Sequence, residues 1–294
     1  MVINKNRNLS LRHILVRVLR LRPVPSGTGL RLMKKNFFGI SKRQKFIITV
    51  VSSSLILFLA EQILGKSGIY IAFFLSFFTI ILLFLSVRKD LKNNFSPQIF
   101  ILPFFYSLAF GLFYFLVPAR FLTRIAITLL YALGLYSLLL TVNIFVVSSI
   151  RTIALLSSAR TVSFIITLLS YFFLANVVFS MHLNVFLTLI LVFGFSFPLI
   201  LYSLWTYSLD SKFFSYVLWV ASLSLSLVEV TLVLWFWPIL PTIIALFLTG
   251  FFYIIVGLSQ VWLEKKLFKS VMWEYIWVGV LVFLVFIFFA FVKK

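Results

Sequence analysis

The chain has 294 residues, of which 63% are hydrophobic and 11% charged, and its formal net charge is +20. Soluble domains usually carry about 25% charged residues, so this composition excludes an ordinary soluble protein. The absence of cysteine excludes disulfides, zinc–thiolate sites and cysteine nucleophiles. Two histidines do not favour a histidine-built metal site either.

Basic residues are concentrated at the start of the chain. The first 45 residues contain 12 of the 26 basic residues and no Asp or Glu. We interpret residues 1–45 as a disordered, basic cytoplasmic tail. For residues 1–32 an over-extended gene start is the alternative, because Met33 opens a stretch typical of a bacterial start, MKKNFFGISKRQKF. Past residue 45 the basic excess is only eight, so nucleic-acid binding has little support.

Apolar runs of about 20 residues, the length that a helix needs to cross a bilayer, recur from residue 46 to the end. A transmembrane β-barrel would show strict alternation in segments of about ten residues, which is absent. The sequence therefore predicts an all-α fold for residues 46–294, a polytopic transmembrane helical bundle of about nine spans without a soluble domain. The predicted spans are 46–64, 69–87, 98–117, 125–147, 162–180, 184–206, 213–236, 241–262 and 272–291.

The distribution of Lys and Arg predicts the orientation, because cytoplasmic loops retain positive charge. With the N-terminus inside, alternate breaks place 21 basic residues on the inner side and five on the outer side. We therefore expect a cytoplasmic N-terminus and, for an odd number of spans, a C-terminus outside. An even number of spans would place Lys293 and Lys294 on the cytoplasmic side, and this position agrees equally well with their positive charge. Trp235 and Trp237, at the outer end of the seventh span, are expected to be interfacial anchors.

The pattern Ser-Ser-x-Arg-Thr occurs twice between the fourth and fifth spans and contains Arg151 and Arg160. At the predicted inner interface, arginines reach lipid headgroups. On one continuous helix a nine-residue offset would turn the two side chains to opposite sides. A turned segment would instead let them bind one phosphate, such as a lipid diphosphate or a nucleotide. Both interpretations make these arginines candidate contacts for anionic headgroups.

Two glutamates lie within predicted spans, where an ionisable side chain is costly and usually functional. Glu61 lies near the outer end of the first span, and Glu229 lies well inside the seventh. Ser222 and Ser226 precede Glu229 by seven and three residues, so all three share one helix face. This face is the candidate intramembrane polar site, with Glu61 as a further member.

The predicted topology places both glutamates in the outer half of the membrane, level with Arg120, Arg124 and His182. One interpretation is a polar cavity that opens to the outside and serves a proton-coupled or anionic substrate. The other is that Glu229 pairs with an arginine or a hydroxyl group and fixes helix packing.

Enzymatic activity has the least support, because the sequence contains none of the motifs His-Glu-x-x-His, GxSxG and P-loop, nor the paired aspartates that membrane transferases use. We expect no cofactor. The intramembrane glutamates favour transport or handling of a small molecule or lipid. The short loops fit the alternative, a structural or assembly subunit with a membrane-protein partner. The lipid bilayer, including its anionic headgroups, is the other expected partner.

Residues 142–164, VNIFVVSSIRTIALLSSARTVSF, and the Phe- and Leu-rich spans after them resemble uncharacterised bacterial multi-pass inner-membrane proteins. The resemblance implies a location in the inner, or plasma, membrane. It brings no activity and assigns no functional residue.

Overall fold

The computed structural model describes residues 41–64, 68–88, 96–117, 121–148, 155–208, 217–265 and 268–292. Residues 1–40 of the predicted tail lie outside these ranges. Regular structure within the ranges is entirely helical. Its elements are α2 (Lys42–Leu64), α3 (Gly68–Val87), the 3-10 helix η1 (Pro97–Phe100), α4 (Ile101–Leu116), α5 (Phe121–Ser148), α6 (Leu156–Ser180), α7 (Val185–Ser208), α8 (Val217–Trp235), α9 (Pro241–Leu263) and α10 (Lys269–Val292).

Each predicted span coincides with one of these helices to within several residues, which confirms the all-α fold class. Eight helices of the described chain, from α3 onward and with η1 and α4 counted as one, are long and apolar enough to cross a membrane. The predicted first span lies on α2, which begins four residues earlier, at Lys42. The chain is therefore a multi-pass membrane protein.

Hydroxyl side chains inside the spans bond to their own helix. Ser76 donates to the carbonyl oxygen of Ala72 at 2.8 Å, and Ser170 donates to that of Ile166 at 2.8 Å. Lipid offers no hydrogen-bond partner, so every polar group at membrane depth has to be satisfied by the protein. These local bonds explain how the sequence keeps many Ser and Thr residues within apolar helices.

Two helix connections at one end of the bundle position the candidate site. Helix α6 ends at Ser180, and His182 adopts a φ of 47°, in the left-handed region. Asn184 then caps α7, because its Oδ1 accepts a hydrogen bond from the backbone N–H of Leu187 at 2.9 Å. Pro241 begins α9, where the N–H that proline lacks would have no partner in the helix. The sequence therefore sets both turns locally.

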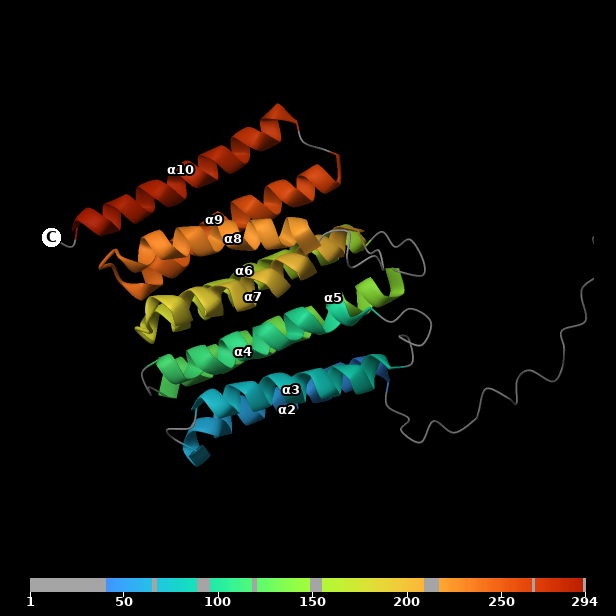
Figure 1. Ribbon diagram of the computed structural model, residues 1–294. Helices are drawn as coiled ribbons and strands as arrows, with labels where there is room; N and C mark the ends of the chain where they lie inside the picture. The colour runs from blue at the N-terminus through green and yellow to red at the C-terminus, as the bar shows by residue number, and fades with distance from the viewer. Residues whose placement is uncertain are drawn as a thin grey trace, which may run out of the picture. The chain divides into compact units, whose positions relative to one another are not determined.

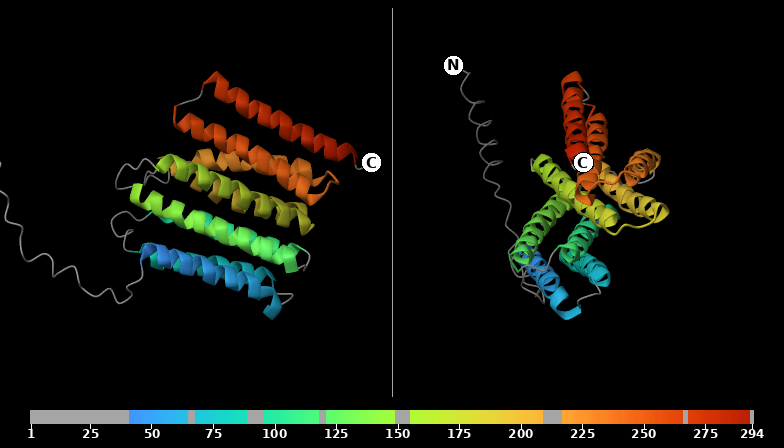
Figure 2. Two further views of the ribbon diagram at one scale, coloured as in Figure 1. Left: turned by 180° about the vertical axis from the view of Figure 1, so that it is seen from behind. Right: turned by 90° about the vertical axis from the view of Figure 1, so that its left-hand side faces the viewer.

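The residues Lys42–Lys294 form one compact unit of helices that lie side by side along their lengths (Figure 1). Helix α6 lies near the middle, in contact with α4, α5, α7 and α9. Helices α2 to α5 pack on one side of it and α7 to α9 on the other (Figure 2). Helix α10 packs against α9 at the edge.

Buried hydroxyl groups connect helices inside the bundle. The Tyr131 hydroxyl of α5 lies 3.1 Å from Ser107 Oγ of α4, which donates to Thr79 Oγ1 of α3 at 3.1 Å. Ser163 of α6 donates to the Tyr202 hydroxyl of α7 at 3.0 Å. An unpaired polar group is costly in this environment, so these bonds specify which helices lie together.

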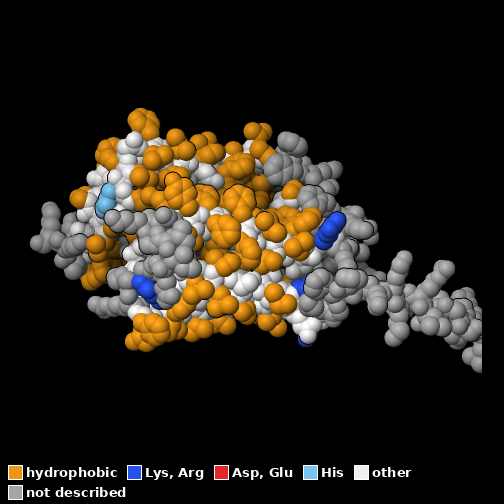
Figure 3. Space-filling model, turned by 90° about the horizontal axis from the view of Figure 1, so that it is seen from below, with side chains coloured by type: hydrophobic (Ala, Val, Ile, Leu, Met, Phe, Trp, Pro, Cys, Tyr) orange, Lys and Arg blue, Asp and Glu red, His pale blue; other side chains and the backbone are white. Residues whose placement is uncertain are grey.

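The outer surface of the bundle is apolar. Hydrophobic side chains cover most of the face seen in Figure 3, and Lys and Arg side chains lie towards its ends. Burial differs sharply between helices, from 67% of the α6 span to 6% of the α10 span. Helix α6 is thus the core of the bundle, and α10 is largely open to the membrane.

Candidate functional site

Three of the predicted site residues cannot be placed in detail. Arg120 and Arg151 lie outside the described residues, and so does the side chain of Glu61 on α2. Their roles stay predictions. Arg124 lies in the first turn of α5 and His182 in the α6–α7 turn. Both lie at the same end of the bundle, as the predicted topology requires.

The candidate polar face of α8 points away from the bundle. Ser222 and Glu229 are exposed, and Ser226 is half-buried and donates to the carbonyl oxygen of Ser222 at 3.2 Å. The buried face of α8 consists of other positions: Val220, Ser224, Leu227, Thr231 and Leu234. Glu229 lines neither of the two pockets described below. The cavity interpretation of this face therefore stays a prediction.

Arg160 connects three helices at the opposite end of the bundle. It lies in the second turn of α6 and donates from Nε to the Thr206 carbonyl at 3.0 Å and from Nη2 to the Tyr207 carbonyl at 3.1 Å. Its Nη1 lies 3.4 Å from Glu264 Oε1, just after α9, and its guanidinium carbon lies 4.8 Å from the centre of the Tyr207 ring. Arg160 therefore satisfies carbonyls at the C-terminus of α7, which a helix leaves without partners.

A pocket of about 330 Å³ lies at the end of the bundle where α6 meets α7 and α8 meets α9. We call it the His182 pocket. Its lining includes His182, Leu183, Thr188, Trp235, Trp237 and Ile244. The lining residues include no Asp, Glu, Lys or Arg, so the His182 imidazole, which can both donate and accept hydrogen bonds, is its most versatile polar group.

Hydrogen bonds hold the walls of the His182 pocket. Trp235 Nε1 donates to the Leu183 carbonyl at 3.3 Å and thereby joins α8 to the α6–α7 turn. The Thr188 hydroxyl donates to the Asn184 carbonyl at 3.0 Å. Trp235 is thus oriented by the protein, which leaves His182 and Trp237 as the groups best placed to meet a ligand.

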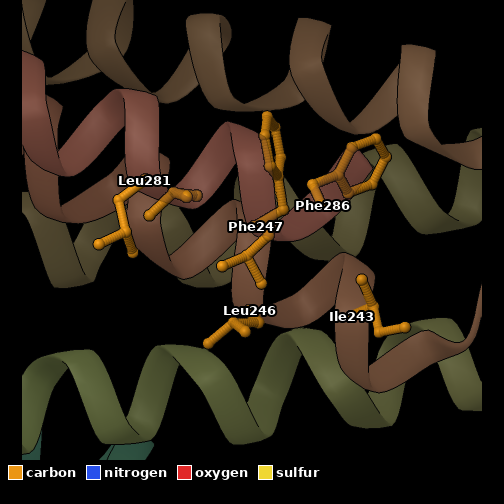
Figure 4. Close-up of a pocket in the computed structure, with 7 residues that line it drawn as sticks. Ile243, Leu246, Phe247, Leu281 and Phe286 are labelled. Atoms are coloured by element: carbon orange, nitrogen blue, oxygen red, sulfur yellow. The ribbon is translucent and has the colours of Figure 1, made fainter. Parts of the chain in front are cut away.

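A second, smaller cavity of about 100 Å³ lies between α9 and α10. We call it the α9–α10 groove. Its lining is entirely apolar, and Ile243, Leu246 and Phe247 of α9 face Leu281 and Phe286 of α10 across it (Figure 4). The Phe247 and Phe286 rings lie 4.7 Å apart, centre to centre.

One pair of aromatic rings connects the two cavities. Trp237, which lines the His182 pocket, packs edge-on against Phe286, which lines the groove, with ring centres 5.8 Å apart. The consecutive residues Ile243 and Ile244 of α9 line the groove and the pocket respectively. The His182 pocket, which contains polar groups and lies at one end of the bundle, therefore borders the apolar α9–α10 groove.

Three residues of the His182 pocket were singled out from the sequence, but the pocket itself was not predicted. His182 was expected as a polar partner for Glu229, and the two tryptophans as anchors. The predicted topology could have brought these residues together. It places the MHLN break, which contains His182, and the WPILP break, which contains Trp237, on the same side of a nine-span bundle. Among the described residues, no group of three His, Asp or Glu side chains could hold a metal ion.

Comparison with known proteins identifies one family. A family model described as "Protein of unknown function (DUF5656)" matches residues 83–289, from the end of α3 to the last turns of α10. No curated protein and no solved structure match the chain.

Proposed function

Because the chain belongs to DUF5656, a family of proteins of unknown function, we propose its activity from the site itself: it binds a lipid or similar amphipathic molecule. The polar part of the ligand occupies the His182 pocket, and its apolar chain lies in the α9–α10 groove. The observation that carries this proposal is the contact between Trp237 and Phe286, which makes the two cavities neighbours.

The His182 pocket suits the polar part of such a ligand. Its volume, about 330 Å³, lies at the lower end of the range for small-molecule sites, about 300–1,000 Å³. The imidazole of His182 and the indole N–H of Trp237 offer hydrogen bonds, while Ile244 supplies apolar contact. This mixture of groups is typical of a site at the boundary between headgroups and hydrocarbon.

The α9–α10 groove suits the apolar part. Leu246 and Leu281, both on its rim, are 48% and 62% exposed, so the groove is accessible from the lipid side of the bundle. An acyl chain that settles there gains about 0.8 kcal/mol for each methylene group that it buries from water, but little relative to surrounding lipid. Binding energy and specificity then come mainly from the polar end.

The charge distribution supports an outer location for the His182 pocket. Basic residues of the described chain gather at the opposite end of the bundle: Lys42, Arg43, Lys45, Arg88, Lys265 and Lys269. Positively charged ends face the cytoplasm in most membrane proteins. We therefore propose a cytoplasmic N-terminus, an outer C-terminus and, following the resemblance, the bacterial inner membrane as the location.

A pair of matched variants tests the role of the groove. Leu281→Trp fills the groove, whereas Leu284→Trp, on the same helix and similarly exposed, lies outside it. We expect Leu281→Trp to reduce labelling of the purified protein by a photoreactive phospholipid in nanodiscs several-fold, and Leu284→Trp to leave it unchanged. Equal labelling of both variants would contradict the proposed tail site.

A second pair tests the pocket. Trp237→Ala removes a ring from the lining, and Trp273→Ala removes a similarly exposed ring on α10 that lines neither cavity. We expect only Trp237→Ala to lower labelling by a headgroup-reactive lipid. Loss of labelling in both variants would point to general tryptophan anchoring instead.

A role as an assembly subunit is the second candidate, and the weak burial of α10 favours it. Only 6% of its span is buried, so most of its surface is available to another membrane protein. Affinity purification from mildly solubilised membranes tests this role. A partner retained by the natural chain and lost when exposed α10 residues such as Leu284 and Phe288 are changed to alanine would support it.

A further inference from the structure

The outward face of α8 carries a regular seam. Leu218, Leu225 and Leu232 recur every seven residues and are 86%, 54% and 39% exposed. Ser222 and Glu229 lie between them, also seven residues apart and also exposed. Spacings of four and three residues alternate along these five positions, which we call the α8 seam. This is the a/d repeat of a coiled coil, with leucine at every d position and a polar residue at a.

Hydrocarbon is a poor environment for this seam. Glu229 is the thirteenth of the 19 residues of α8, inside a helix long enough to span the membrane. Among the described residues no ion pair involves its carboxylate. A carboxyl group at this depth normally faces another protein group or water rather than lipid. A protein partner with hydrogen-bonding groups at the same level would give the carboxyl of Glu229 such an environment.

A second copy of the chain meets this requirement. Across a two-fold axis along the membrane normal, each α8 seam would face an identical one, as in most homodimers. In register, Ser222 of one copy faces Ser222 of the other and Glu229 faces Glu229, and two facing carboxyl groups that share a proton are joined by a hydrogen bond. The small Ser222 side chain allows close approach of the two helices. A polar residue at a fixes the register of such a pair.

We propose that two copies of the chain pair in parallel through the α8 seam, with Glu229 setting the register. Helix α8 lies at the periphery of the bundle, against α7 and α9, so its outward face is available to a second copy. Trp235 of the His182 pocket lies about 100° around the helix from the seam, so pairing leaves the ligand site open. The dimer is thus independent of the lipid-binding proposal.

The cysteine-free chain allows a direct test. We would introduce single cysteines by Ser222→Cys and Leu225→Cys in the seam and by Leu133→Cys on α5, which is 68% exposed. In vesicles of phosphatidylcholine at a low protein-to-lipid ratio, mild oxidation should produce disulfide-linked dimers from the two seam variants and not from Leu133→Cys. Absence of seam dimers, equal cross-linking of all three variants, or cross-linking in native membranes to a different protein alone would overturn the proposal.

The role of the carboxyl group is tested by equilibrium dimerisation in the same vesicles, measured by energy transfer between labelled copies. Glu229→Leu should raise the dissociation constant of the dimer by about 3- to 20-fold, the effect expected for one interhelical hydrogen bond in a membrane. Glu229→Gln keeps a hydrogen-bonding side chain and should have a smaller effect. An unchanged dissociation constant for Glu229→Leu would contradict the assigned register.

Discussion

Arg160→Ala should destabilise the bundle by about 2–4 kcal/mol. The guanidinium group makes two charge-assisted hydrogen bonds, at 3.0 and 3.1 Å, to the last carbonyls of α7. Each such bond contributes about 1.5–3 kcal/mol where it is buried. The pair with Glu264, at 3.4 Å and with side chains 20% and 29% exposed, adds about 1 kcal/mol at most. Because water reaches part of Arg160, these contributions are reduced, and the expected cost lies around and below the lower end of their sum, at about 2–4 kcal/mol.

The assay is the free energy of unfolding in lipid bicelles. Glu264→Gln removes the ion pair with Arg160 and should cost about 1 kcal/mol or less. Arg160→Lys keeps the charge, but an ammonium group cannot bond both carbonyls as the planar guanidinium does. Its loss of unfolding free energy should therefore lie between those of Glu264→Gln and Arg160→Ala. A change below about 0.5 kcal/mol for Arg160→Ala would refute this role, because it is smaller than one ordinary hydrogen bond. If anionic-lipid binding fell instead, the predicted headgroup contact would be the better account.

Three further predictions concern the bundle. Tyr131→Phe removes a hydroxyl from the buried network and should cost about 1 kcal/mol in the same unfolding assay, with no loss indicating that the network is dispensable. Gly111→Ala should cost about 1–3 kcal/mol because a Cβ there would lie 2.9 Å from the backbone of Ala72, whereas Gly194→Ala, where nothing lies within 4 Å, should be neutral or stabilising. In intact cells an impermeant thiol reagent should label Met181→Cys but not Lys265→Cys, and the reverse pattern would invert the proposed orientation.

The spans were predictable because lipid imposes a simple rule. A helix that crosses the membrane needs a continuous apolar run, and charges or turn residues mark its ends. Sequence reasoning placed the start of the fifth span at residue 162, but α6 begins at Leu156 and includes Arg160. The charge of Arg160 predicted a position at an end of the bundle, but it could not predict the hydrogen bonds of Arg160 to the last carbonyls of α7.

The partners of individual residues were much less predictable. Glu264 lies 104 residues from Arg160 in sequence, and Phe286 lies 49 residues from Trp237, so both contacts depend on how α9 packs against its neighbours. Helix periodicity grouped Ser222, Ser226 and Glu229 on one side of α8. It could not show whether that side faces the bundle, because both sides of α8 are rich in leucine and valine.

The most direct test of lipid binding is cross-link mapping with two photoreactive phospholipids in nanodiscs, one with the reactive group at the headgroup and one with it in the upper acyl chain. If the His182 pocket holds the headgroup and the α9–α10 groove holds the chain, headgroup adducts should lie within residues 178–188 and 235–241, and acyl-chain adducts within 243–247 and 281–286. Both should decrease when excess unlabelled lipid is added. Adducts spread evenly over the exposed surfaces of α3, α5 and α10, without saturation, would contradict a specific lipid site.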